Sequence, residues 1–128
     1  MTYFIEKTVD AGLDEAVERV TAALKEEGFG VLTDIDVRAT LKNKLGVDFR
    51  PYRILGACNP GYAHTALQLE PMIGTMLPCN VIVQETDGGT MVAAIDPIAS
   101  MQAVTNPELG KIAGEVRARL AQAIARLA

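Results

Sequence analysis

A chain of 128 residues fits a single domain, because domains typically span roughly 100–200 residues. Its composition, 49% hydrophobic and 22% charged, is that of an ordinary globular protein and excludes a disordered or collagen-like chain. Twelve Lys and Arg against 16 Asp and Glu give a net charge of −4, which argues against nucleic-acid binding, since that function needs clustered positive charge.

The N-terminal sequence indicates a compartment. Residues 3–9 follow the initiator Met without the basic and apolar regions of a signal peptide, and no apolar run approaches the roughly 18–20 residues of a membrane span. We therefore expect a cytoplasmic protein with no membrane partner. Its two cysteines are too few for a disulfide scaffold, and we expect both thiols to be reduced.

The first half of the chain shows alternating strand and helix patterns. Residues 3–9 alternate between apolar and polar side chains, which predicts a strand with one buried face. Apolar residues from Leu13 to Leu24 recur at spacings of four, three and four, which predicts a helix that Gly28 ends with a left-handed cap. A second alternating strand is predicted over residues 31–37.

On that second strand Asp34 and Asp36 fit a solvated face. A short helix is expected over residues 39–45, and a strand over 52–58. Asn59-Pro60 then has the form of a cap followed by proline in the first helical turn, so a short helix is predicted up to residue 70.

The second half of the chain predicts a hairpin and a long helix. Strands are expected over residues 77–85 and 90–96, joined by the turn residues 87–89. Residues 107–127 carry a regular apolar stripe and form the last predicted helix. The order β-α-β-(α)-β-α-β-β-α predicts an α+β fold, a single domain over residues 1–128, in which helices cover one face of a mainly antiparallel sheet.

Three short stretches are not required for building a core, namely residues 56–60, 77–80 and 96–97. Each cysteine is followed by asparagine at the edge of a predicted strand. We take as candidate ligand-binding residues Cys58, Asn59, Cys79, Asn80, His64 and Asp96.

The thiols allow two interpretations. Cys58 lies beside the start of the helix predicted after Asn59, where the positive end of the helix dipole favours a thiolate, the form that acts as nucleophile and metal ligand. Cys79 would join it if their strands are neighbours. Alternatively, both are small core residues and the asparagines hydrogen-bond turns. In that case Asp96 before Pro97 is simply a turn residue.

The sequence contains no recognisable metal-binding or hydrolase motif. Cys58, His64 and Cys79, completed by Glu70 or Asp96, match none of the usual zinc spacings, so we expect no metal site. There is no G-x-S-x-G motif around the single serine of the chain and no phosphate-binding loop. Whether the chain is an enzyme, and with what cofactor, stays open.

The apolar stretch Met72–Leu77 is a further candidate feature. We expect it to be a loop that something covers, and methionine-rich surfaces adapt to partners or apolar ligands. The alternative is that these methionines fill the core.

The sequence also resembles a known family. The resemblance is to the bacterial and archaeal family of domains of unknown function numbered 302, at Ile54-Leu55-Gly56-Ala57-Cys58-Asn59-Pro60, Leu77-Pro78-Cys79-Asn80-Val81, Asp96-Pro97, Gly28-Phe29-Gly30 and residues 63–71. It implies a compact α+β shape related to the TATA-binding-protein fold and a tendency to pair as homodimers. It implies no activity for any of these residues.

Two hypotheses for the function follow. The first is a homodimeric module that binds a small or apolar ligand, or a protein partner. It is favoured because both faces of the predicted sheet carry apolar residues, Val81 and Val83 on one and Ile82 on the other. The alternative is a thiol-dependent redox or metal-binding site built on Cys58 and Cys79.

Overall fold

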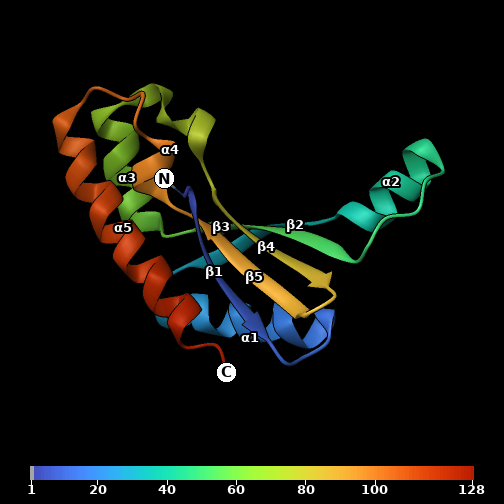
Figure 1. Cartoon of the computed structure of the whole chain (residues 1–128). Helices are drawn as coiled ribbons and strands as arrows, with labels where there is room; N and C mark the ends of the chain where they lie inside the picture. The colour runs from blue at the N-terminus through green and yellow to red at the C-terminus, as the bar shows by residue number, and fades with distance from the viewer. Residues whose placement is uncertain (1) are drawn as a thin grey trace.

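The computed structural model describes residues 2–128, and within them five strands form one antiparallel sheet (Figure 1). In the spatial order β1-β5-β4-β3-β2, the strands are β1 (Phe4–Val9), β5 (Gly89–Ile95), β4 (Cys79–Thr86), β3 (Tyr52–Cys58) and β2 (Gly30–Asp36). The helices are α1 (Leu13–Glu26), α2 (Val37–Leu45), α3 (Pro60–Leu69), the 3-10 helix η1 (Pro71–Met76), α4 (Pro97–Ser100) and α5 (Pro107–Ala125). The predicted α+β class and order of elements are confirmed. In this part of the chain, no helix combines the length and hydrophobicity needed to cross a bilayer.

The main core lies between one face of the sheet and the helices α1 and α5. The register places Leu55 opposite Val81 and Val81 opposite Ala94, so these fully buried side chains share that face. They belong to one apolar cluster with Val20 of α1 and Leu120 of α5. The apolar stripes predicted for both helices therefore face the sheet.

Two short helices were not predicted. Residues 71–76 form η1 rather than a loop, and Ile73 is its buried residue. Asp96 is more than a turn residue, because its side chain accepts a hydrogen bond of 2.9 Å from the backbone N–H of Ile98 and caps α4. With six and four residues, these helices are too short to show the 3.6-residue period by which helices are found in a sequence.

The side chains of β2 are arranged differently from the prediction. A bulge between Val31 and Thr33 shifts the register, so that Asp34 lies opposite Leu55 on the helix-covered face and Ile35 lies opposite Ile54 on the other face. A bulge inserts one residue and thereby exchanges the two faces of a strand. Asp34 is exposed as predicted, yet it forms an ion pair with Arg53.

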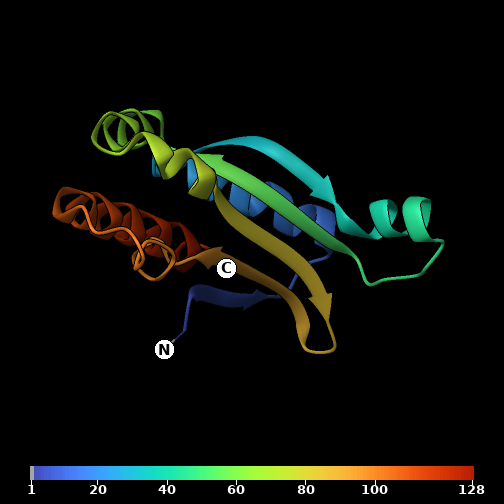
Figure 2. The same cartoon turned by 90° about the horizontal axis from the view of Figure 1, so that it is seen from above.

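Figure 2 looks onto the face of the sheet that lies opposite α1. We call this surface the open face. At one end of it stands the end wall, residues 60–78 and 97–110, which carry α3, η1, α4 and the start of α5. At the other end projects the arm, residues 37–51, which carries α2. The sheet thus forms the floor between two raised ends (Figure 1).

Candidate functional site

An apolar cavity lies where the ends of β3 and β4 meet the end wall and α5. Its volume open to the centre of a water-sized molecule is about 40 Å³, and its walls are almost wholly apolar. Both Cys-Asn motifs contribute to it. Its lining includes Phe29, Cys58, Asn59, Tyr62, Leu77, Cys79, Met101 and Val116. The cavity therefore unites segments that are far apart in the sequence, and it is the best candidate for a ligand site.

The two cysteines reach this cavity from neighbouring strands. Ala57 of β3 lies opposite Cys79 of β4, which meets the condition that the sequence analysis set for bringing Cys58 and Cys79 to one site. Both thiols are free and half-buried. Burial, and to a smaller extent the neighbouring Cys58, raises the pKa of the Cys79 thiol to about 11. At neutral pH Cys79 is therefore almost entirely a neutral thiol, which is a poor nucleophile and a poor metal ligand.

Asn59 lies between the end of β3, the start of α3 and the turn after α1, beside the cavity. Its side-chain oxygen accepts a hydrogen bond of 3.4 Å from the backbone N–H of Tyr62, and Pro60 is the first helical residue, so the predicted start of α3 is confirmed. On its other side, a Cβ atom on Gly28 would lie 3.0 Å from Asn59 Nδ2, and Gly28 has φ of +85°. Gly28 thus has the predicted left-handed conformation after α1, and its lack of a side chain leaves room for the Asn59 amide.

The other three candidates lie elsewhere. Asn80 is exposed on the open face, opposite Gly56, and His64 is exposed on α3. Tyr62 and Ala66 line the cavity, and His64, two residues from each, lies on another side of the helix. Asp96 caps α4. Among residues 2–128, no group of three or more His, Cys, Asp and Glu side chains has an arrangement that could hold a metal ion.

Sequence reasoning missed the cavity residues that have no motif. Tyr62 and Met101 come from two segments of the end wall and meet only through the packing of that wall on α5. The one available signal in the sequence was the apolar character of residues 72–77, which indicated that this segment is covered by other residues or by a ligand.

Asp96 joins the end wall to α5. Its Oδ2 accepts a hydrogen bond of 2.9 Å from Nε of Arg117. Burial alone would raise the pKa of Asp96, but the hydrogen bonds from Arg117 and from the backbone N–H groups of Ile98 and Ala99 outweigh it, so the pKa is lowered. Asp96 is therefore a structural residue that fixes α4 next to the cavity.

The lowered pKa predicts a pH-dependent contribution to stability. A carboxyl group with a lower pKa in the folded protein stabilises it above its unfolded pKa, about 3.9, and this stabilisation is lost as the pH falls through the folded pKa. Asp96→Asn keeps a capping residue but loses the charge, so we expect up to about 1 kcal/mol of lost stability at pH 7. Urea unfolding should show this difference shrinking at pH 3. The exposed Glu18→Gln control should show no loss, and an equal loss at both pH values would contradict the assignment.

The environment of the thiols predicts a difference in their reactivity. A pKa of about 11 instead of 9.0 reduces the thiolate fraction of Cys79 at pH 8 roughly 100-fold. In alkylation kinetics, the Cys58→Ala variant, which retains Cys79, should label far more slowly than Cys79→Ala, which retains Cys58 at the start of α3. Both variants should label equally fast in urea. Faster labelling of folded Cys79 would show that the thiol is not desolvated.

Comparisons with known proteins agree on a family. A family model described as "Domain of unknown function DUF302" matches residues 5–127. The chain is also similar to the crystal structure of an uncharacterised conserved DUF302 protein from Bacillus stearothermophilus, with 33% sequence identity, complete coverage of both chains and a TM-score of 0.93. No protein among the curated ones matches the chain.

Proposed function

The chain belongs to the DUF302 family of domains of unknown function, and we propose that it acts as a homodimeric binding module. In this proposal the open face of the sheet pairs with a second copy of the chain, and the apolar cavity beside the cysteines takes a small apolar ligand. The apolar character of the open face is the observation that carries the proposal.

The open face carries apolar side chains on all its strands. Phe4 of β1, Met91 and Ile95 of β5, and Ile82 of β4 line a shallow hollow of about 420 Å³. Glu6, Asn80 and Gln84 line the same hollow. Ile35, at the outer edge of the sheet, is exposed. Apolar side chains gathered on an uncovered sheet face are typical of interaction sites, and most soluble oligomers pair with copies of their own chain.

A charge in the middle of this face tests the pairing. Ile82 is half-buried and lies on the central strand β4, so its side chain would be covered by the partner sheet. We expect Ile82→Asp to convert the dimer into a monomer with an unchanged circular dichroism spectrum, because the interface would bury an unpaired carboxylate. Ile82→Val is the matched control and should stay dimeric. A folded Ile82→Asp dimer would exclude the open face as the interface.

The cavity supports the second half of the proposal. Its volume exceeds the roughly 10–15 Å³ needed for one water molecule, yet its nearly apolar walls offer a water few partners. Such cavities bind small apolar molecules instead. The same apolar surroundings, together with the raised pKa of Cys79, favour binding over the alternative of thiol-based redox or metal chemistry.

The natural ligand of the cavity is unidentified. Xenon is a suitable probe in its place, because dry apolar cavities bind it. In methyl NMR spectra under xenon pressure, we expect shifts at Ala63 and Val116, which line the cavity, and none at exposed Ala125. Ala63→Leu should fill the space and remove the shift at Val116. Shifts at neither cavity residue in the folded protein would overturn the ligand site.

A further inference from the structure

The arm contacts its own chain through β2, β3 and a hydrogen bond from Nε of Arg50 to Oε1 of Gln84, but its helix buries little surface. α2 has nine residues and none of them is buried, although Asp36 caps its start and Gly46, with φ of 68°, caps its end. Isolated helices shorter than roughly 12–15 residues are only marginally stable in water. Apolar side chains are nevertheless exposed on this arm, with 69% of Leu45 and 45% of Val47 accessible. These features indicate that the arm packs against another molecule.

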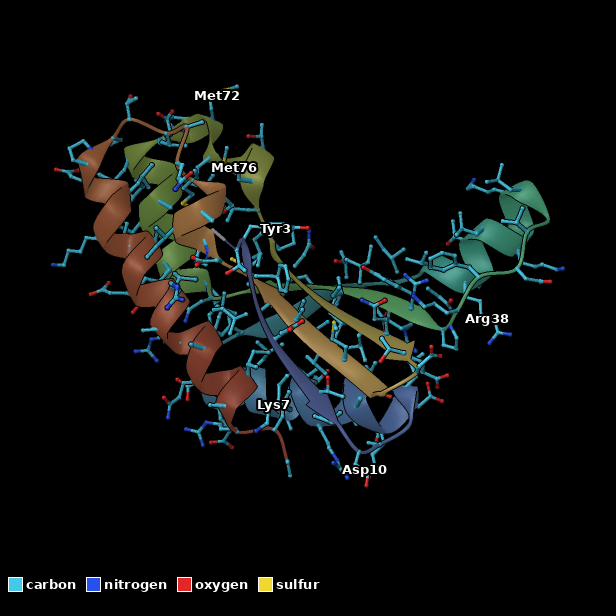
Figure 3. The ribbon with its side chains drawn as sticks, in the orientation of Figure 1. Tyr3, Lys7, Asp10, Arg38, Met72 and Met76 are labelled. Carbon is cyan, nitrogen blue, oxygen red and sulfur yellow. The ribbon has the colours of Figure 1, made fainter. Side chains whose placement is uncertain are left out.

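A complementary surface lies on the end wall. Met72 and Met76 of η1 are 71% and 37% exposed, and Leu67 of α3 is exposed as well. A hollow of about 320 Å³ on this wall is lined by Glu70, Met72, Met76 and neighbouring residues. Figure 3 shows the two methionines at one end of the molecule and Arg38 of the arm at the other. Most of the exposed large apolar side chains among the described residues thus lie on the arm or the end wall, apart from Tyr3, Leu32 and Ile35.

The charges of the two surfaces are opposite. Residues 37–51 contain four basic residues and one acid, a net charge of +3 in a chain of net charge −4. The end wall, residues 60–78 and 97–110, contains Glu70 and Glu108 and no Lys or Arg. The arm is therefore attracted to an end wall and repelled by another arm.

Symmetry then selects one arrangement of two facing sheets. If the two-fold axis runs along the line from arm to wall, each arm lies over the partner's arm, and two surfaces of charge +3 meet. If the axis runs across that line, each arm lies over the partner's end wall, and the same favourable contact forms twice, as a two-fold interface requires.

We propose that in the homodimer the arm of each protomer docks on the end wall of its partner, with Leu45 and Val47 against the partner's Met72 and Met76. This placement rests on the proposed pairing of open faces. The arm's lysines then lie near the partner's Glu70, and the exposed apolar side chains of both ends become buried.

Cross-linking between two protomers that carry different cysteine substitutions tests this placement of the arm. In a Cys58→Ala, Cys79→Ala background, Leu45→Cys and Met72→Cys are introduced into separate chains, which are mixed, exchanged and treated with a short bismaleimide. We expect covalent dimers in the mixture and little product from either variant alone. Light scattering before the reaction establishes that the mixture is dimeric.

Each other outcome has a definite meaning. Cross-linking of Leu45→Cys alone would show arm against arm and overturn the placement. A dimer without cross-links would overturn it too, while the proposed pairing would stand. A monomeric parent protein would overturn the proposed function itself.

A charge exchange provides an independent measurement. We expect Lys44→Glu and Glu70→Lys each to raise the dimer dissociation constant several-fold, because each places like charges on facing surfaces, and the double variant to restore it. Additive weakening in the double variant would contradict the contact between arm and wall.

Discussion

Leu120→Ala is expected to lower the free energy of unfolding by about 2–5 kcal/mol, because truncation of a buried leucine loses transfer free energy and leaves a cavity. Leu120 is fully buried and belongs to the main apolar cluster between α5 and the sheet. Urea-induced unfolding, followed by circular dichroism, measures the effect.

The matched control lies two residues further along the same helix. Gln122 is exposed, so Gln122→Ala should change the stability by less than about 0.5 kcal/mol. Equal midpoints for the two variants would mean that α5 does not present Leu120 to the core.

Gly56→Ala should destabilise the protein by about 1–3 kcal/mol through overpacking. Gly56 is the first residue of the stretch 56–60 that contains Cys58 and Asn59, and a Cβ atom there would overlap Oγ1 of Thr33 and lie 2.7 Å from Cγ of Pro78. The rigid ring of Pro78 has to move, and Pro78 also lines the cavity. The substitution should therefore weaken xenon binding as well as stability.

Gly88→Ala serves as the control for this substitution. A Cβ atom on Gly88 would meet no atom within 4 Å, and Gly88 lacks a positive φ, so its variant should be nearly as stable as the parent. A Gly56→Ala variant with parental stability and parental xenon binding would show that β3 and Pro78 can separate at no cost.

The regular elements were predictable because their patterns are local. The helical spacing of the apolar residues from Leu13 to Leu24 identified α1, and Asn59-Pro60 identified the start of α3. The bulge in β2 was not predictable from the sequence. A bulge is an irregularity in the pairing with the neighbouring strand, and the alternation of apolar and polar residues does not mark where it occurs. Asp34 and Ile35 consequently lie on the faces opposite to those expected.

Only part of the candidate site was predictable, because only some of its residues stand in a local sequence motif. Cys58 and Cys79 both line the cavity because β3 and β4 are neighbours, a pairing that the sequence analysis left open. Met101 joins them only through the tertiary packing of the end wall, for which the sequence has no short-range signal. His64 was a candidate from its distance to Cys58 alone, and the helical phase of α3 turns it towards solvent.

The mass of the protein in solution tests the central claim, the pairing of two open faces, most directly. Light scattering at micromolar concentration should give twice the chain mass of 13.7 kDa, because the open face and the exposed side chains of the arm are both covered by a second copy. A mass of 13.7 kDa for the folded protein at this concentration would contradict it.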